Sequence, residues 1–296
     1  MELRVLNYFL MVAREENITK AAQLLHVTQP TLSRQLMQLE EELGVKLFQR
    51  SNHSITLTEE GMLLRRRAQG LISLAEKTKR DLMQKEAELT GEISIGCGEL
   101  QSVDFLAKLL ARFQATHPLV QMSIFSGNAD SIKERIENGL LDMGLVPEPV
   151  DMTKYAFLHV PQKEIWGVLV HKDSEFAGKQ SVSPSDLLHV PLMISDRDLV
   201  QGFIANWFGV NFDDLHIVCR YNLLYNAAIM VRNKIGAAVC IKLDCSYDDT
   251  CFLPFSPPVE SGSVLVWKKD QMTSPTTAAF LEYSQKCVRD ISINTI

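Results

Sequence analysis

The stretch VTQPTLSRQLMQLEEELG, residues 27–44, has the spacing of an amphipathic helix with a polar beginning and an acidic end. Four leucines fall at steps of 4, 3 and 4 residues and therefore share one buried face: Leu32, Leu36, Leu39 and Leu43. The opposite face and its flanks carry Pro30, Thr31, Ser33, Arg34, Met37, Gln38 and Glu41. Among these, the Gln, Ser, Thr and Arg side chains can hydrogen-bond base edges and phosphates. Because phosphates would repel the acids at 40–42, a DNA contact would use the first two turns. The alternative is an ordinary amphipathic surface helix.

Two shorter helices are predicted before this one. Apolar residues at 6, 9, 10 and 13 predict a helix over residues 2–15. NITKAAQLLHV, residues 17–27, offers Asn17 or Thr19 as an N-cap, and its paired alanines allow close helix packing. Thr28 is the expected N-cap of the third helix, where Pro30 in the first turn leaves no hydrogen bond unmade. Two helices joined by a turn of about three residues form a helix-turn-helix.

The next segment, VKLFQRSNHSITLTEEG, residues 45–61, alternates short apolar runs with turn residues. This pattern predicts a two-stranded hairpin or wing with Ser51 and Asn52 at its tip.

Residues 1–61 resemble the N-terminal domain of LysR-type transcriptional regulators. The resemblance depends on the order and spacing of Ala-Ala, Gln-Pro, Ser-Arg, Leu-Glu, Leu-Gly, Leu-Phe-x-Arg and Leu-Thr-x-x-Gly. It implies a winged helix-turn-helix whose third helix enters the major groove, with Arg50 in the wing reaching the backbone or minor groove. The residues expected to contact DNA are Gln29, Pro30, Thr31, Ser33, Arg34, Gln38 and Arg50. Further basic residues often follow that wing arginine in the family, whereas Asn52, His53 and Ser54 follow it here.

A long helix is predicted from about residue 58 to residue 88. Small and apolar residues recur at steps of 4, 3, 4, 3 and 4, as in a heptad seam: Leu64, Ala68, Leu71, Ala75, Thr78 and Leu82. A helix of about 30 residues spans roughly 45 Å, which exceeds one face of a small domain. We therefore expect it to pair with another chain, the alternative being a connector helix lying on its own protein.

Charge is distributed unevenly along the 296 residues. The net charge is −6, but residues 1–90 hold 13 Lys and Arg against 12 Asp and Glu, a net of +1, which leaves −7 for the rest. Basic residues that the predicted fold brings together would favour DNA: Arg34, Lys46, Arg50 and Arg65 to Arg67. A module of charge +1 is a weak electrostatic binder, so doubling it by dimerisation is physically favourable.

Composition predicts a globular protein of two or three domains, since 46% of the residues are apolar. The sequence has neither a run of about 18 apolar residues nor a signal-peptide pattern, so we expect no membrane association and a cytoplasmic location. Cys240, Cys245 and Cys251 could form a metal or redox cluster, but their uneven spacing and apolar neighbours favour buried reduced thiols. No metal and no cofactor are assigned.

Residues 92–296 alternate strand-like runs with helical stretches, a pattern typical of an α/β domain with mainly parallel sheets. GCGELQS and SGNADS match neither a dinucleotide fingerprint nor a P-loop, and no Gly-x-Ser-x-Gly occurs. The seven histidines are scattered, and the Asp pairs at 213–214 and 248–249 lie in hydrophilic surroundings. These observations do not favour an enzyme.

The LysR resemblance extends through this half in GEISIGCG, KIGAAVCI and the closing VLVWKKD. It implies a periplasmic-binding-protein-like effector domain with lobe I at 91–161 and 267–296 and lobe II at 162–266. Small ligands in such folds lie beyond the carboxyl ends of strands, near helix N-termini. The residues mapped to that cleft are Gly98, Glu99, Gln101, Ser102, Asn128, Ala129, Val146, Pro147, Ser195, Tyr221 and Asn226.

Two of these positions leave alternatives open. An acid at the cleft mouth, Glu99, favours a cationic or hydroxyl-rich effector, or it points to solvent. Ser102, at the start of the helix SVDFLAKLLARF, either presents its hydroxyl to the cleft or only caps that helix.

The sequence therefore predicts a transcription factor with a winged helix-turn-helix at 1–57, a linker and dimerisation helix at 58–90, and an effector-binding domain at 91–296. The expected partners are a double-stranded DNA operator, a small-molecule effector, and further copies of the chain in a homodimer or homotetramer. RNA polymerase is a further candidate. The competing hypothesis is a solute-binding or enzymatic α/β protein whose N-terminal helices serve only assembly.

Overall fold

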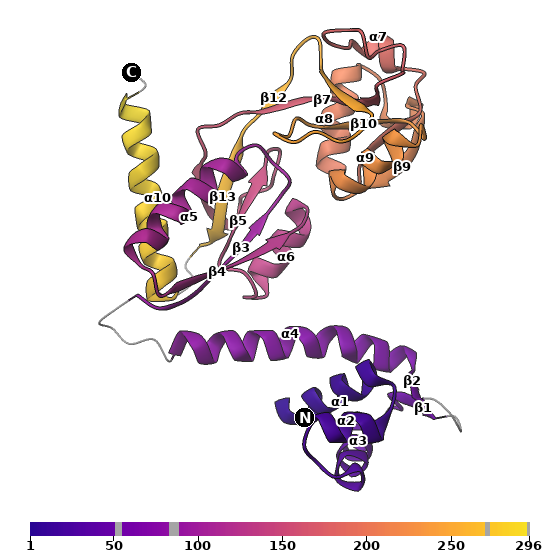
Figure 1. Cartoon of the computed structure of the whole chain (residues 1–296), viewed down its shortest axis with the longest axis vertical. Coiled ribbons are helices and arrows are strands. Elements are labelled where there is room, and N and C mark those ends of the chain that lie inside the picture. The colour runs from indigo at the N-terminus through magenta and orange to yellow at the C-terminus, as the bar shows by residue number, and fades with distance from the viewer. Residues whose placement is uncertain (51–54, 83–88, 270–272, 295–296) are drawn as a thin grey trace. The chain divides into compact units, whose positions relative to one another are not determined.

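The computed structural model describes residues 1–50, 55–82, 89–269 and 273–294 (Figure 1). These residues form two compact units, Met1–Met83 and Gln84–Ile296. None of the described helices is both long enough and apolar enough to cross a lipid bilayer.

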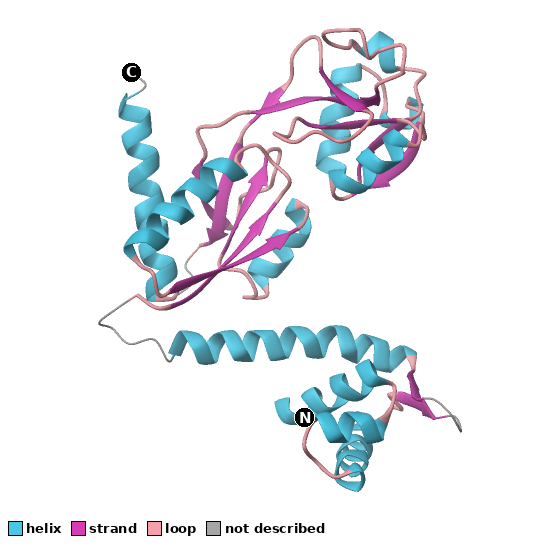
Figure 2. Cartoon of the chain, viewed as in Figure 1, coloured by secondary structure: helices cyan, strands magenta, loops and turns pink. Residues whose placement is uncertain are grey.

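The first unit is helical except for a small hairpin (Figure 2). Its elements are α1 (Leu3–Glu15), α2 (Ile18–Leu24), α3 (Gln29–Leu43), β1 (Phe48–Arg50), β2 (Ile55–Leu57) and α4 (Glu59–Leu82). The first three helices pack on one another around a core that includes Phe9, Ala21 and Leu36. Antiparallel β1 and β2 form the predicted wing, with Phe48 paired to Leu57. The expected tip at Ser51 and Asn52 lies outside the described residues.

Helix ends in this unit follow local chemistry. Asn17 caps α2, because its Oδ1 accepts the backbone N–H of Lys20 at 2.9 Å. Gly44 ends α3 in the left-handed conformation, with φ 69°, which suits a residue without a Cβ. Gly61, in the first turn of α4, lies so close to the preceding chain that a Cβ there would be 2.2 Å from the Leu47 carbonyl oxygen. The Leu-Gly and Leu-Thr-x-x-Gly motifs are therefore explained by backbone conformation and by packing.

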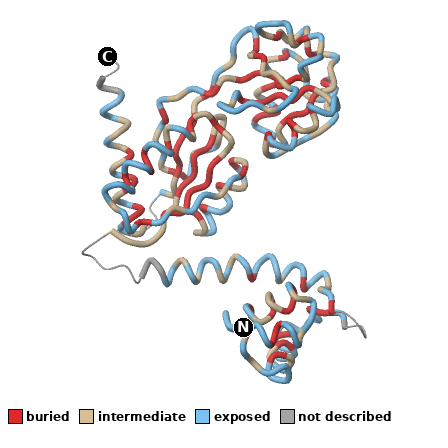
Figure 3. Tube along the Cα trace, viewed as in Figure 1, coloured by how far each residue is buried: buried red, intermediate tan, exposed pale blue. Residues whose placement is uncertain are grey.

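The second unit contains two sheets, each with helices on both faces. In lobe I the strand order is β4-β3-β5-β13-β6, formed by β3 (Gly91–Cys97), β4 (Val120–Ser126), β5 (Met143–Pro147), β6 (Tyr155–His159) and β13 (Ser263–Lys268). One face packs against α5 (Val103–Thr116) and α10 (Pro275–Asn294), and the other packs against α6 (Ala129–Glu137). The central strands β3, β5 and β13 are mostly buried between these helices, whereas the edge strands β4 and β6 are largely exposed or half-buried (Figure 3).

The lobe II sheet has the order β11-β7-β10-β8-β9, with short β12 paired to β7. Its strands are β7 (Glu164–His171), β8 (Leu192–Ser195), β9 (Ile217–Tyr221), β10 (Ala237–Ile241), β11 (Thr250–Pro254) and β12 (Glu260–Ser261). Helix α8 (Asp198–Phe208) packs on one face and α9 (Leu224–Arg232) on the other. The short helices α7 (Pro184–Leu187) and η1 (Phe212–Asp214) lie in its connections.

Two sequence predictions need correction. The sheets are mixed and not mainly parallel, because β13 runs antiparallel to β5 and β6, while β7 runs antiparallel to β10 and β11. The return to lobe I was predicted at residue 267 but occurs before β13, so residues 263–266 belong to the lobe I sheet. The error has a physical cause: β13 is buried on both faces, so its apolar run fits the core of either lobe equally well.

Candidate functional site

Helix α3 exposes a polar surface next to the turn that follows α2. Its leucines at 32, 36 and 39 are buried in the first unit, so the opposite side faces solvent. Exposed on that side are Gln29, Pro30, Thr31, Arg34 and Gln38, with Ser33 half-buried beside them. The structure therefore brings six of the seven predicted DNA-contacting residues onto one helix. Arg50 belongs to β1, and its side chain lies outside the described residues.

Polar side chains at the start of α3 contact one another without capping the helix. Thr28 Oγ1 lies 2.8 Å from Thr31 Oγ1, and the Gln29 amide donates to Ser33 Oγ at 2.9 Å. Thr28 has the extended backbone of an N-cap but makes no side-chain cap hydrogen bond, and the first turn has no acidic residue. An exposed helix N-terminus of this kind has the geometry and the partial positive charge to bind a phosphate.

Glu40 has a structural role that the sequence did not reveal. Its side chain is 6% exposed, and its carboxylate accepts the backbone N–H of Leu47 at 2.9 Å, that of Phe48 at 3.3 Å, and the Lys46 ammonium at 2.8 Å. Burial raises the pKa of Glu40, but these hydrogen bonds outweigh it, so the pKa lies below its usual value. The acidic residues 40–42 therefore do more than end α3 in solvent, because Glu40 positions the start of the wing.

Most of helix α4 is exposed or half-buried (Figure 3), and several of its apolar side chains are left uncovered by its own unit. Of the predicted seam, Ala68 is fully buried in the described chain, whereas Leu71 is 42% exposed and Thr78 is exposed. Leu74, outside the predicted seam, is 38% exposed. Nothing is described of the Leu82 side chain. The middle of α4 thus presents an apolar surface to solvent.

A cavity of about 90 Å³ lies where the carboxyl ends of strands from both lobes meet. Lobe I contributes the turns after β3 and β4 and the last residue of β5. Lobe II contributes the beginning of β7, the ends of β8, β9 and β10, and the starts of α8 and α9. Its lining residues are Gly98, Glu99, Leu100, Gly127, Asn128, Ala129, Pro147, Trp166, Ser195, Arg197, Val200, Tyr221, Asn222, Leu223, Leu224, Val239, Cys240 and Ile241. This is the position where open α/β sheets place ligands.

Seven of the predicted effector-contacting residues line this cavity: Gly98, Glu99, Asn128, Ala129, Pro147, Ser195 and Tyr221. The other four predicted positions do not. Val146 is fully buried in the core beside α6, and Asn226 is exposed on the first turn of α9. The Gln101 side chain donates instead to Asp244 Oδ1 at 3.1 Å.

Both alternatives for Ser102 are wrong. Its side chain is 0% exposed, it makes no cap hydrogen bond, and Oγ has no partner among the described residues. The backbone N–H groups of Gln101 and Ser102 donate to the carboxylate of Glu164, at 3.0 Å and 3.1 Å. Glu164 is itself 0% exposed, at the first position of β7. The start of α5 is therefore satisfied by a carboxylate of the protein and is closed to a ligand.

Glu99 does not simply point to solvent. It lines the cavity from lobe I, and its Oε2 accepts the backbone N–H of Leu224 at the start of α9 in lobe II. A carboxylate at a helix N-terminus is electrostatically favourable. Glu99 therefore joins the two lobes across the cavity.

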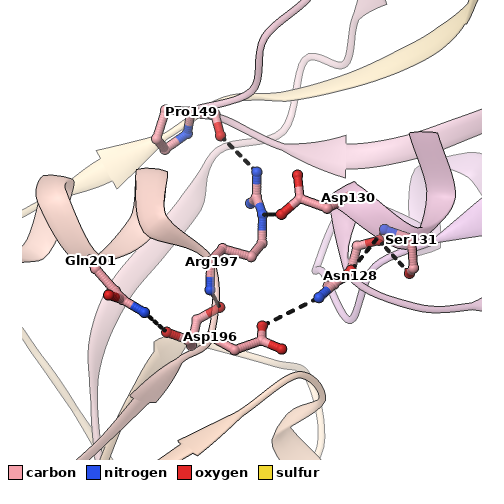
Figure 4. A network of polar contacts seen from close by, with 8 residues as sticks. Asn128, Asp130, Ser131, Pro149, Asp196, Arg197 and Gln201 are labelled. Atoms are coloured by element: carbon pink, nitrogen blue, oxygen red, sulfur yellow. Dashed lines mark hydrogen bonds and ion pairs between the residues drawn. The ribbon is translucent and has the colours of Figure 1, made fainter. Parts of the chain in front are cut away.

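Arg197 is the main site residue that the sequence analysis missed. Its side chain is 4% exposed, its Nε lies 3.3 Å from Asp130 Oδ2, and its Nη2 donates to the Pro149 carbonyl at 3.1 Å (Figure 4). Next to it, Asn128 Nδ2 donates to Asp196 Oδ1 at 3.2 Å. An arginine two residues after the strand-end Ser195 was the available signal, because ligand-binding residues gather at carboxyl ends of strands.

The three clustered cysteines have different surroundings. Cys240 is buried and Cys251 half-buried, but Cys245 is exposed, so the prediction of buried thiols is wrong for Cys245. Burial raises the pKa of Cys240 to about 12, which keeps this thiol protonated at neutral pH. In the part of the chain that the structure describes, no three His, Cys, Asp or Glu side chains gather as metal ligands.

Comparison with known proteins identifies both units. Residues 3–62 match the bacterial regulatory helix-turn-helix family model of the lysR family, and residues 86–287 match the LysR substrate binding domain. The chain belongs to the LysR family. It is a DNA-binding transcriptional regulator with an effector-binding domain, as the family match and the named relatives show.

Relatives of this LysR-family chain are regulators and not enzymes. The HTH-type transcriptional activator IlvY of Salmonella typhimurium is 32% identical over 209 residues, 70% of this chain and 71% of that protein. The Hca operon transcriptional activator HcaR of Escherichia coli is 28% identical over 99% of this chain and 100% of its own length. The competing hypothesis of a solute-binding or enzymatic protein is therefore wrong.

The fold is shared with solved full-length structures. CbnR, a LysR family transcriptional regulator, covers 97% of this chain and 99% of its own, with a TM-score of 0.74 and 22% identity. A structure of full-length CbnR with its target DNA gives a TM-score of 0.73 at the same coverage. At this identity the likeness establishes the fold of both units.

Proposed function

We propose that the exposed face of α3 reads the operator and that ligand binding in the inter-lobe cavity changes transcription. The observation that carries the proposal is the set of polar side chains exposed together on the first turns of α3, with no acid in the first turn. Arg34 supplies a charged, forked donor for a guanine edge or a phosphate. The side chains of Gln29, Thr31 and Gln38 supply neutral hydrogen-bonding groups beside it.

The effector acts by population shift in this proposal. The cavity walls come from both lobes, so a ligand held by both favours the lobe arrangement in which its contacts are complete. That bias alters how paired helix-turn-helix units are spaced on DNA, which couples the two sites.

Self-assembly through α4 completes the proposal. Leu71 and Leu74 are exposed apolar side chains on a charged helix, and a second α4 would bury them. Pairing also doubles the weak charge of the DNA-binding unit, which strengthens binding to DNA. We infer a homodimer that can associate to a homotetramer, acts in the cytoplasm, and contacts RNA polymerase at regulated promoters.

The test of DNA readout begins by mapping the genomic fragments that the full-length protein retains, to define an operator. Arg34→Ala should then weaken operator binding by about 5-fold to 150-fold, since a good arginine contact contributes about 1–3 kcal/mol. Its thermal unfolding should match that of the parent, because Arg34 is exposed. Arg112→Ala, on the exposed side of α5, is the matched control and should bind as the parent does. Unchanged operator affinity of Arg34→Ala would remove α3 from this role.

The test of assembly is Leu71→Lys, which would place like charges from two chains opposite one another. Light scattering at low micromolar concentration should show a smaller particle than the parent. Ser73→Lys, exposed on the same helix but outside the seam, should keep the parent's mass. Equal masses for all three proteins would place the dimer contact elsewhere.

A further inference from the structure

The cavity contains a buried cation whose hydrogen-bonding capacity is only partly used. The Arg197 guanidinium carries five N–H groups, and its contacts with Asp130 and the Pro149 carbonyl use Nε and Nη2 (Figure 4). Among the described residues, Nη1 makes no hydrogen bond, although the side chain is 4% exposed and lines the cavity. Asp130 is a weak partner, since its side chain is 60% exposed and the ion pair is 3.3 Å long. A buried guanidinium in this state favours an additional anionic acceptor.

An anion lines the same cavity from the other lobe. Glu99 uses Oε2 to accept the N–H of Leu224, and in the described part of the chain its Oε1 makes no hydrogen bond. A carboxylate can accept several hydrogen bonds, so Oε1 is available to a donor on a ligand. The cavity therefore offers a donor group on lobe II and an acceptor group on lobe I.

The remaining walls are largely apolar. Trp166 has its indole N–H bonded to Ser261 Oγ at 3.0 Å, so only its ring is available to a ligand. Aliphatic side chains complete the lining: Leu100, Val200, Leu223, Val239 and Ile241. A volume of about 90 Å³ favours a small ligand with an apolar body and two polar ends.

We propose that the effector is a small zwitterion of the α-amino-acid type, with its carboxylate on Arg197 and its ammonium group on Glu99. This inference rests on the proposed role of the cavity as the effector site. A simple carboxylate would satisfy Arg197 but would bring a second negative charge to Glu99, and a simple amine would repel Arg197 in the same way. A zwitterion complements both groups and joins the lobes through its own charges.

The test mixes the purified full-length protein with each proteinogenic L-amino acid that has an uncharged side chain, one at a time. Binding is measured by thermal unfolding and by titration calorimetry. At least one of them should raise the unfolding temperature in a saturable manner. For that amino acid, the amine without the carboxylate and the acid without the amine should each bind at least tenfold more weakly. Absence of binding by the whole panel overturns the proposal, and so does equal binding of either one-charge analogue.

Variants assign the two contacts. Glu99→Gln and Arg197→Lys should each weaken binding of the amino acid at least tenfold, because one loses the charge and the other the planar fork. Glu134→Gln and Arg112→Lys make the same chemical changes at exposed positions outside the cavity and should bind as the parent does. If Arg197→Lys does not fold, Glu99→Gln and the analogue comparison still decide. Parental affinity in both cavity variants would overturn the proposal.

This test separates the ligand class from the proposed function. Operator binding by the parent protein, and its loss in Arg34→Ala, are measured with no amino-acid ligand added. A protein that binds the operator through α3 but binds no amino acid contradicts only the ligand class. Amino-acid binding together with full operator binding by Arg34→Ala contradicts only the role proposed for α3.

Discussion

Helices α3 and α5 both begin with backbone N–H groups that their own first turns cannot satisfy, but their surroundings are opposite. At α3, Thr28 makes no side-chain cap, no acid lies in the first turn, and the neighbouring side chains face solvent. At α5, the N–H groups of Gln101 and Ser102 end on the buried carboxylate of Glu164. The same backbone feature is thus open to a phosphate in one unit and closed by the protein in the other.

The comparison teaches that a helix N-terminus identifies a ligand site only when its surroundings are known. At α9 the N-terminus is also occupied from within the chain, by Glu99. The ligand-binding capacity of the effector unit therefore depends on side chains such as Arg197 and on the free oxygen of Glu99. The DNA-binding unit, in contrast, uses a helix start that remains accessible.

The largest expected effect comes from removing the carboxylate that satisfies the N-terminus of α5. Glu164→Ala leaves one buried and one part-buried N–H group without an acceptor, so it should destabilise the full-length protein by about 3 kcal/mol. Urea unfolding measures this change. Glu134→Ala, at an exposed position of α6, is the control and should change stability by less than about 0.5 kcal/mol. A Glu164→Ala protein as stable as the control would show that water replaces the carboxylate without cost.

A second prediction tests the buried carboxylate at the other end of α3. Glu40→Gln should lower stability by about 1–2 kcal/mol at pH 7, because charged hydrogen bonds to Lys46 and to the start of the wing are lost. The pKa of Glu40 is depressed from 4.5 in the folded protein, so its contribution is complete above the unfolded value and is lost as the pH falls through the folded value. The stability gap between parent and variant should therefore narrow below about pH 4.5. Glu41→Gln, exposed next to it, should show no such gap.

A smaller effect is expected from the two helix caps of the DNA-binding unit. Asn17→Ala removes a cap hydrogen bond from Lys20 and should cost about 1 kcal/mol of stability. Thr28→Ala removes no cap hydrogen bond, so the free energy of unfolding, measured by thermal unfolding, should change by only a few tenths of a kcal/mol. Equal losses in the two variants would mean that the start of α3 is capped in solution and is less open than the structure shows.

The smallest effect is expected at Ser102. Its hydroxyl is buried without a partner among the described residues, so Ser102→Ala should be neutral or slightly stabilising in urea unfolding. Ser183→Ala is the contrasting variant, because Ser183 forms a capping box with Asp186 at the start of α7 and should lose about 1 kcal/mol. A loss of similar size at Ser102 would indicate a partner for its hydroxyl, such as a buried water.

Much of the DNA-binding unit was predictable because its signals are local. The spacing of the leucines predicted α3, and the paired alanines predicted that α2 packs closely on its neighbours. The exposed polar face of α3 followed from helical geometry alone. The role of Glu40 was not predictable, because its hydrogen-bonding partners lie seven and eight residues further along the chain, beyond the end of α3. In a run of three glutamates, periodicity cannot say which of them meets the wing.

The cavity was partly predictable by position. Residues at or just beyond the ends of strands reached it, such as Gly98, Asn128 and Ser195, because parallel strands end at a common edge. Ser102 and Gln101 did not, because Glu164 at the start of β7 reaches the same helix start. That contact joins residues more than sixty positions apart, and no local pattern encodes it.

The sequence by itself determined the family, the helix-turn-helix and the alternation of strands and helices, because these depend on residue spacing within a few turns. Only the tertiary structure decided where β13 belongs, which helix starts remain open, and that Arg197 and Glu99 face one cavity. The physical reason is that hydrogen-bond satisfaction and burial are properties of side chains brought together from distant segments. A carboxylate such as Glu164 is a surface charge or a buried helix cap depending on what packs around it.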